Sequence, residues 1–168
     1  MVDRGHIRIV LRAAARDEAP QIHRVLAEAF KPYRRDYTDE AYRATVVPTE
    51  EIERRIDDPQ TDVLVAVWGT DVVGTATVVP LDESSIYIKS MAVASGFQGK
   101  GIALELLKSI EQAARLRGYT RMVLDCYEPL TKAIALYERV GFRRTGESKP
   151  YHGIVVFEMA KAIKPPRS

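Results

Sequence analysis

The 168-residue sequence is poor in cysteine, and the single Cys126 excludes an internal disulfide and a zinc site built on cysteines. It also lacks an apolar run approaching the roughly 20 residues that span a bilayer. The first ten residues include Asp3, Arg4, His6 and Arg8, so they lack the hydrophobic core of a signal peptide. From these absences we expect a cytoplasmic protein with no membrane association and no metal site.

The overall composition is that of a globular protein. Hydrophobic residues make up 46% of the chain and the net charge is only +2, which argues against intrinsic disorder. The length suits one domain with a sizeable core. We therefore expect a single domain over residues 1–163, followed by a short frayed tail over residues 164–168.

The charge is unevenly distributed along the chain. Residues 98–168 contain 13 basic against 7 acidic side chains, whereas residues 61–97 contain 1 against 4. A basic C-terminal part favours an anionic ligand, either a phosphorylated cofactor or a nucleic acid, although a solvated surface has the same composition. Because the basic residues are interspersed with acidic ones and no recognition motif is present, we do not expect nucleic-acid binding.

Hydrophobic periodicity predicts the order β-α-α-β-β-β-α-β-α-β-β. Asp17 and Thr49 are the expected N-caps of the first two helices. Between these helices, residues 31–48 are rich in aromatic and charged side chains, and we expect a loop with a short helix. The predicted helices cover residues 17–30, 49–58, 99–117 and 131–140, and the predicted strands cover residues 7–11, 63–67, 72–79, 85–93, 119–126, 142–145 and 154–159.

The succession of strand, helix and strand over residues 85–126 favours a parallel βαβ unit, whereas the preceding strands form an antiparallel meander. The predicted fold class is therefore α/β, with a mixed, mostly antiparallel sheet and helices on both faces. Within residues 85–93 the alternation breaks, because Met91, Ala92 and Val93 are all apolar. Such a loss of phase predicts a β-bulge, and bulges occur often beside active sites.

Gly99 and Gly101 stand where a strand ends and a helix begins. Glycines there allow the backbone to approach a ligand, and the unpaired N–H groups of a helix N-terminus favour a phosphate. The pair alone is a weak signal, since a tight turn has the same residues. It is neither a Walker A loop nor a Rossmann fingerprint, in which Leu104 would be the third glycine.

Two longer stretches resemble the GNAT superfamily of N-acetyltransferases. Residues 88–103 are similar to motif A, whose Gln/Arg-x-x-Gly-x-Gly/Ala pattern reads here as Gln98, Gly101 and Ala103. Residues 133–142 look like motif B, with Tyr137 in its Leu-Tyr-x-x-x-Gly-Phe segment. The two matches stand in the family's order, and the resemblance extends over about residues 7–160. It implies a GNAT-like fold and acetyl-CoA as co-substrate.

The resemblance also implies roles for individual residues. The backbone of Met91, Ala92 and Val93 would pair with the pantetheine arm, and the Val93 N–H would stabilise charge on the thioester oxygen. Tyr137 would lie near the sulfur as general acid. The diphosphate would be held by Gln98, Gly99, Lys100, Gly101, Ile102 and Ala103.

Two positions depart from the family pattern. Leu130 replaces an asparagine that contacts the cofactor arm in many members, and Tyr87 replaces a glutamate that serves as base. The base is therefore not identified, and Glu83 and Asp125 are the candidates. We prefer a buried structural thiol to a nucleophile for Cys126, and we expect direct attack of the amine without an acetylated enzyme.

The acceptor is expected to be a primary amine, most simply of a small molecule, bound by Tyr33, Tyr37, Tyr87 and His152. Packing for the tyrosines and a surface position for His152 remain the alternatives. Acidic residues of the same region could attract a cationic amine; these are Asp36, Asp39 and Glu40. Other open functions are acetylation of proteins or peptides and non-catalytic sensing of acyl-CoA. As an oligomer, the chain could be a monomer or a homodimer.

Overall fold

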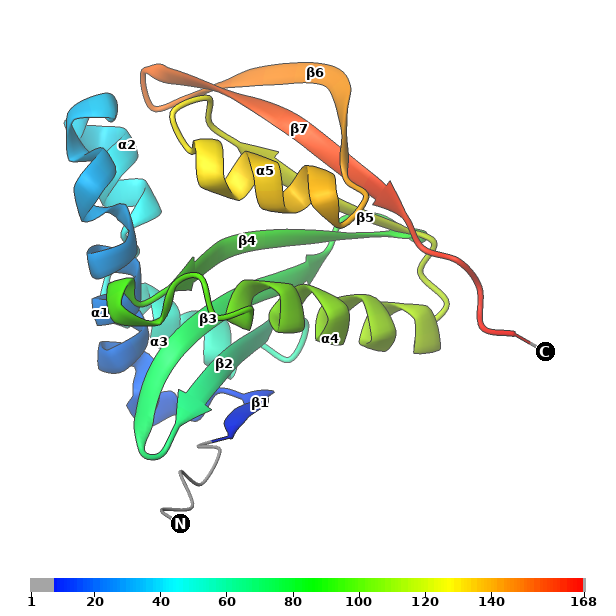
Figure 1. Ribbon diagram of the computed structural model, residues 1–168, viewed down its shortest axis with the longest axis horizontal. Helices are drawn as coiled ribbons and strands as arrows, with labels where there is room; N and C mark the ends of the chain where they lie inside the picture. Colours follow the sequence, from blue (N-terminus) through cyan, green and yellow to red (C-terminus); the bar gives the residue numbers. More distant parts are fainter. Residues whose placement is uncertain (1–7, 168) are drawn as a thin grey trace, which may run out of the picture.

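The computed structural model describes residues 8–167 and contains one seven-stranded mixed sheet (Figure 1). The strand order is β1-β2-β3-β4-β5-β7-β6, and the only parallel neighbours in this part of the chain are β4 and β5. The predicted mixed sheet is therefore confirmed. The strands are β1 (Ile9–Ala13), β2 (Asp62–Trp68), β3 (Asp71–Pro80), β4 (Ser85–Val93), β5 (Arg121–Cys126), β6 (Arg143–Tyr151) and β7 (Ile154–Ala162).

Helices cover both faces of the sheet, with α4 crossing one face of β2–β4 and α3 behind the same strands (Figure 1). The close approach of α4 depends on Gly74 of β3, because a Cβ there would lie 3.0 Å from Ile102 Cγ2. The helices are α1 (Ala19–Phe30), α2 (Asp39–Thr45), α3 (Thr49–Asp57), α4 (Ile102–Leu116) and α5 (Thr131–Arg139), with 3-10 turns η1 (Arg16–Glu18), η2 (Lys31–Asp36) and η3 (Ser95–Phe97).

The buried side chains form two large clusters. One joins α1 and α3 to the first strands and includes Ile22 and Leu26. The other joins α4 and α5 to β5 and β7 and includes Ile110 and Met159, whereas Leu106 of α4 belongs to the first cluster. Burial of each such side chain contributes about 1.5–3 kcal/mol, so these clusters fix the positions of the helices that surround the site.

The parallel pair β4–β5 separates part of the way along its length. Pairing runs from Ser85 opposite Arg121 to Ile88 opposite Leu124 and extends no further in the described strands. On the other side of β4, the register with β3 shifts between Thr75 and Thr77, and Ser90 has a φ of 52°. This is the predicted β-bulge. The end of β4 therefore has no strand partner on its β5 side.

Several local expectations were wrong. Asp17 lies in η1, and α1 begins at Ala19 without a side-chain cap, because Pro20 already supplies a favourable first turn. Thr49 is the first helical residue of α3, and Pro48 holds the N-cap position. The penultimate strand extends to residue 151 instead of 145, since its exposed polar residues show no alternation.

Other expectations meet the limits of the described chain. The predicted start of the first strand at Ile7, like His6, lies outside the described residues. Between residues 8 and 167, no helix combines the length and apolar character needed to cross a bilayer. In the same range, no three His, Cys, Asp or Glu side chains gather closely enough to hold a metal ion.

Candidate functional site

Two cavities meet beside the separated end of β4. The first has a volume of about 390 Å³ and lies between β4, the start of α4 and α5; we call it the glycine-side cavity. The second has a volume of about 340 Å³ and lies between β4, β5, α2, α3 and the β6–β7 hairpin; we call it the tyrosine-rich cavity. Phe30, Met91 and Tyr137 line both. A molecule in each cavity can therefore reach the same point.

Nine of the ten residues predicted to bind the cofactor line the glycine-side cavity. The exception is Lys100, whose ammonium lies over the Phe97 ring at 5.6 Å from its centroid. The chain thus brings together two stretches separated by α4 and β5. The nine lining residues are Met91, Ala92, Val93, Gln98, Gly99, Gly101, Ile102, Ala103 and Tyr137.

The backbone at the start of α4 is suited to an anion. Gly101 is the N-cap with a φ of +82°, which a residue with a Cβ adopts only with strain. The first helical hydrogen bond runs from the Glu105 N–H to the Gly101 carbonyl at 3.0 Å. The N–H groups of the turn before Glu105 therefore have no partner within the helix. Lys132 and Arg139 of α5 line the same cavity and add positive charge. Such a helix N-terminus favours a phosphate group.

A side chain holds the glycine loop against the end of β4. The Gln98 amide donates a hydrogen bond to the Val93 carbonyl at 3.1 Å. This contact fixes the distance between the anion-binding turn and the unpartnered strand end. A ligand that extends along the cavity can therefore bind both with little rearrangement.

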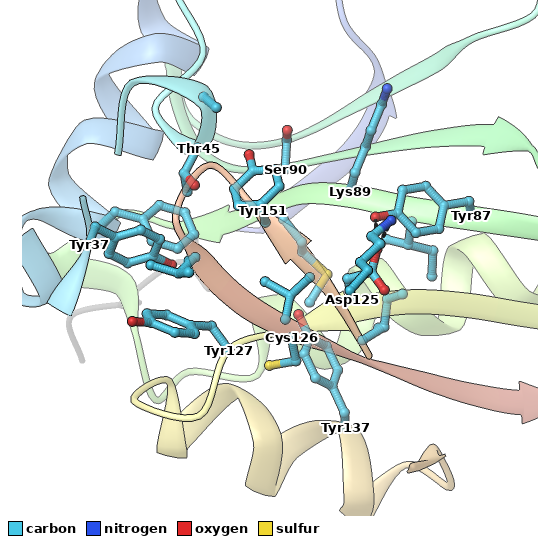
Figure 2. Close-up of a pocket in the computed structure, with 18 of the residues that line it drawn as sticks. Tyr37, Thr45, Tyr87, Lys89, Ser90, Asp125, Cys126, Tyr127, Tyr137 and Tyr151 are labelled. Atoms are coloured by element: carbon cyan, nitrogen blue, oxygen red, sulfur yellow. Dashed lines mark hydrogen bonds and ion pairs between the residues drawn. The ribbon is translucent and has the colours of Figure 1, made fainter. Parts of the chain in front are cut away.

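Tyr137 lies at the junction of the two cavities. Its side chain is buried, its ring packs edge-on against Phe142 at 5.8 Å, and its hydroxyl points from α5 into the site (Figure 2). Burial raises the pKa of the Tyr137 hydroxyl above its ordinary value, with a smaller contribution from Cys126. The hydroxyl is therefore neutral near pH 7 and able to donate a hydrogen bond.

The tyrosine-rich cavity contains a bridge between β4 and β5 (Figure 2). The Tyr87 hydroxyl donates to Asp125 Oδ2 at 2.6 Å, and Lys149 Nζ lies 2.9 Å from the same oxygen. Burial and the adjacent carboxylate raise the pKa of Tyr87. Both partners contact Oδ2, so these two side chains leave the other oxygen of Asp125 unused, and Asp125 lines a cavity of polar and aromatic groups.

The candidate base at Glu83 is not brought to the site. Glu83 is exposed in the turn before β4, whereas Met91 is near the opposite end of that strand. Eight residues at about 3.3 Å each separate the two by roughly 26 Å. Of the two carboxylates proposed from the sequence, only Asp125 lines a cavity.

The predicted acceptor residues divide between locations. Tyr37 and Tyr87 line the tyrosine-rich cavity. Tyr33 lines the glycine-side cavity instead. His152 lines neither, because the tight β6–β7 turn exposes it and places Tyr151 toward the cavity.

The acidic residues expected to attract a cationic amine also lie outside both cavities. Asp39 is paired with Arg34, and Asp36 contributes its carbonyl oxygen to a bond from the Tyr127 hydroxyl. Glu40 is exposed on α2. The Asp39 carboxylate is therefore paired locally, and Asp36 and Glu40 are exposed to solvent.

Cys126 is buried at the end of β5, with 4% of its surface exposed. Burial raises the pKa of its thiol to about 11. At neutral pH only about 1 thiol in 10,000 is ionised at that pKa, which makes it a poor nucleophile. This agrees with the structural role preferred from the sequence.

Three basic residues of the tyrosine-rich cavity were missed by the sequence analysis: Arg55, Lys89 and Lys149. Arg55 stands in a run of charged residues on α3 that reads as a solvated helix face. Lys89 occupies a position of β4 that alternation assigns only to a face, not to a cavity. No local pattern joins these residues, since they come from three separate elements.

Sequence comparisons identify relatives of this chain. The model of the acetyltransferase (GNAT) family matches residues 21–142. N-acetyltransferase 8B of Rattus norvegicus is 36% identical over 91 residues, which cover 51% of this chain and 41% of that protein. N-acetylaspartate synthetase of Danio rerio is 39% identical over 70 residues, which cover 42% of this chain and 25% of that protein. The matched region is thus under half the length of these curated relatives.

Solved structures share the fold at low sequence identity. PaiA N-acetyltransferase from Thermoplasma acidophilum, in complex with coenzyme A, has a TM-score of 0.79 and 16% identity, covering 92% of this chain and 99% of its own. YncA from Salmonella typhimurium, a putative acetyltransferase with acetyl-CoA, has a TM-score of 0.74 and 19% identity, covering 96% and 97%. The predicted GNAT-like fold is confirmed. Because the family match extends over most of the chain and includes both Met91 and Tyr137, the chain belongs to the acetyltransferase (GNAT) family.

Proposed function

We propose that this protein transfers an acetyl group from acetyl-CoA to the primary amine of a small molecule. The observation that carries the proposal is the meeting of the two cavities at Met91 and Tyr137. One cavity suits a long phosphorylated cofactor, and the other suits a compact acceptor. Their junction is the point at which a thioester and an amine come into contact.

The glycine-side cavity supports the cofactor half of the proposal. N–H groups of the first turn of α4 bind the diphosphate, with Lys132 and Arg139 nearby. The pantetheine arm pairs with the end of β4, where β5 no longer does. The Val93 N–H then stabilises the thioester oxygen as negative charge develops on it. Leu130, which lines this cavity, offers the arm an apolar contact in place of an amide.

The amine must lose a proton before it attacks. A lysine-like amine has a pKa of about 10.4, so at pH 7 about 1 molecule in 2,500 is neutral, a cost of roughly 4.6 kcal/mol. Asp125 is the carboxylate of the tyrosine-rich cavity, held by Tyr87 and Lys149. We assign the acceptance of the amine's proton to it, directly or through a water molecule.

Acetyl transfer then follows as a single sequence of bond changes. The amine nitrogen forms a bond to the acetyl carbon and releases its second proton to solvent, the carbon–sulfur bond breaks, and the electron pair leaves on sulfur. A thiol pKa near 8.5 lies below that of tyrosine, so full proton transfer from Tyr137 is uphill by at least about 2 kcal/mol. Burial raises the pKa of Tyr137 further. Tyr137 therefore hydrogen-bonds the departing thiolate, and solvent supplies its proton.

The boundaries of the tyrosine-rich cavity favour a small acceptor over a protein. The Thr38 hydroxyl donates to the His152 carbonyl and joins the start of α2 to the β6–β7 turn. A Cβ at Gly153 would lie 3.0 Å from Thr38 Cγ2, so these segments are in direct contact. Their neighbours Tyr37 and Tyr151 line the cavity, whose volume of about 340 Å³ is of the size that suits a small molecule.

The test is a panel of amines and lysine-containing or free-N-terminal peptides mixed with acetyl-CoA, read by release of free thiol. We expect turnover with small amines and heat on titration of coenzyme A. Faster turnover with peptides than with small amines would identify peptides or proteins as the acceptor class instead. Binding of coenzyme A without turnover on any acceptor would identify a sensor, and no detectable binding would overturn the proposal.

A further inference from the structure

The tyrosine-rich cavity has an excess of positive charge. The charged side chains that line it are Arg55, Lys89, Lys149 and Asp125. Asp125 and Lys149 form an ion pair at 2.9 Å, so their charges offset each other. The remaining two cations have no carboxylate in the cavity itself. A polycationic acceptor would therefore be repelled, and an acceptor with a negative group would be attracted.

Arg55 has hydrogen-bonding capacity that the protein leaves unused. Within residues 8–167, its Nε is the one buried side-chain nitrogen or oxygen that lacks a hydrogen-bond partner. Only 16% of the side chain is exposed. An unpaired donor on a buried guanidinium is costly, so a ligand atom that accepts from it gains more than it would at the surface.

The nearest carboxylate does not satisfy Arg55. Glu51 Oε1 lies 3.6 Å from Arg55 Nε, beyond hydrogen-bond distance. The other oxygen of Glu51 accepts from Arg54 at 2.6 and 2.9 Å, which draws the carboxylate toward the exposed side of α3. Lys89 is half-buried beside Arg55, and burial together with Arg55 lowers the pKa of Lys89. Arg55 and Lys89 thus share the Glu51 carboxylate as their partner, although it lies beyond hydrogen-bond distance of Arg55 and is turned toward solvent.

The position of Arg55 relates this positive group to the reacting centre. Its Nη1 donates to the Ser90 hydroxyl at 2.8 Å, and Ser90 is the bulge residue directly before Met91. Consecutive Cα atoms are about 3.8 Å apart. An anion at Arg55 therefore lies beside the residue that precedes Met91, in the same cavity that reaches the junction.

We infer that the acceptor is an α-amino acid whose carboxylate binds Arg55 and Lys89 and whose uncharged side chain packs among the tyrosines. This inference rests on the proposed acetyl transfer and names its substrate class. A planar guanidinium matches the two oxygens of a carboxylate. The apolar part of the acceptor meets the rings of Tyr37, Tyr87 and Tyr151. The same cations disfavour the ammonium form and so help the amine to become neutral.

The test compares each L-amino acid with its own amide, for example L-phenylalanine with L-phenylalaninamide. The amide is the less basic amine, so amine protonation alone would favour it. We expect kcat/KM for the acid to exceed that for the amide by at least about tenfold, the worth of one hydrogen bond to a charged group. An equal or better amide throughout the panel overturns the inference.

Variants then locate the effect. Arg55→Gln should raise KM for the acid about 10- to 100-fold and leave that for the amide nearly unchanged. Lys89→Met should have the same sign and a smaller size. Arg24→Gln is the matched control, because Arg24 is an exposed helical arginine that lines neither cavity. Melting curves verify folding, and equal losses in the control and Arg55→Gln contradict the assignment.

Titrations with coenzyme A separate this inference from the function on which it rests. Turnover of amines without preference for the acid removes the substrate class alone and leaves acetyl transfer in place. Absence of both coenzyme A binding and turnover removes the proposed function and, with it, this inference. Titration of N-acetyl-L-phenylalanine into the coenzyme A complex measures binding of the acetylated product without catalysis. Arg55→Gln should weaken this binding by about tenfold or more.

Discussion

At the scale of single residues, the hydroxyl of Tyr137 is the group whose removal is cleanest to interpret. Tyr137→Phe keeps the ring that packs against Phe142 and removes only the donor at the cavity junction. We expect kcat to fall about 10²-fold, the usual cost of losing one donor to developing charge, with KM for acetyl-CoA nearly unchanged. Steady-state rates by thiol release measure both.

The pH profile adds a second reading of Tyr137. Because burial raises the pKa of its hydroxyl, the group stays protonated and no loss of activity from its ionisation should occur up to about pH 10. Tyr119→Phe is the control, since Tyr119 lines a separate cavity beside the end of α4. Full kcat in Tyr137→Phe at every pH would show that Tyr137 contributes only packing and that its hydroxyl has no role in the reaction.

Cys126 gives a prediction of the opposite kind, in which a residue beside the site is not required. Its thiol has a pKa raised to about 11 by burial, so at pH 8 about 1 in 1,000 is ionised. Alkylation by iodoacetamide should be slow and should accelerate about tenfold per pH unit toward pH 11. Cys126→Ala should keep kcat within about threefold; loss of all activity together with fast alkylation at neutral pH would indicate a nucleophile.

At the scale of elements, the glycines at the two ends of α4 allow an effect on stability to be distinguished from an effect on ligand binding. Gly101 and Gly118 flank this helix, both have positive φ (+82° and +87°), and a Cβ at either meets nothing within 4 Å. Alanine at either position should therefore destabilise the fold by a similar amount, about 1–2 kcal/mol. Urea unfolding of the two variants measures this shared cost.

The two glycines differ in what they face, since only Gly101 lines a cavity. Gly101→Ala should weaken coenzyme A binding about tenfold beyond anything seen in Gly118→Ala, because the added Cβ stands where the phosphate approaches the backbone. Calorimetry at equal protein stability gives the comparison. Equal affinities in both variants would exclude this turn from the phosphate site.

The elements also show which parts of the molecule are readable from sequence. The helix α4 was predicted because one continuous stretch has helical hydrophobic periodicity, and the bulge of β4 because the alternation of its strand breaks. The strand β6 was predicted too short, because its exposed residues carry no burial pattern. The caps at Asp17 and Thr49 failed because neighbouring prolines set the helix starts instead.

The same contrast divides the two cavities. The glycine-side cavity is built mainly from residues 91–103 and from α5, so local motifs reveal it. The tyrosine-rich cavity joins α2, α3, β4, β5 and the β6–β7 hairpin, and its charged groups stand up to nearly a hundred residues apart. A buried arginine such as Arg55 is indistinguishable in sequence from its exposed neighbour Arg54, because the difference arises only when β4 packs against α3.

At the scale of the whole molecule, the arrangement of the cavities determines the order of events. The two cavities are separate spaces that meet at Met91 and Tyr137, so under the proposed function cofactor and acceptor can be bound at once. The protonated thiol of Cys126 offers no efficient relay for the acetyl group. We therefore expect direct transfer within a ternary complex, without an acetylated intermediate.

Initial-rate kinetics test this order in the intact protein. With acetyl-CoA and acceptor varied together, double-reciprocal lines should intersect, because both substrates must be present before thiol is released. Mass spectrometry after mixing with acetyl-CoA alone should find no acetyl group on the chain, and a rapid-mixing trace should have no thiol burst. Parallel lines with a burst equal to the enzyme concentration would require a covalent acetyl-enzyme, and the two cavities would then be used in turn and not together.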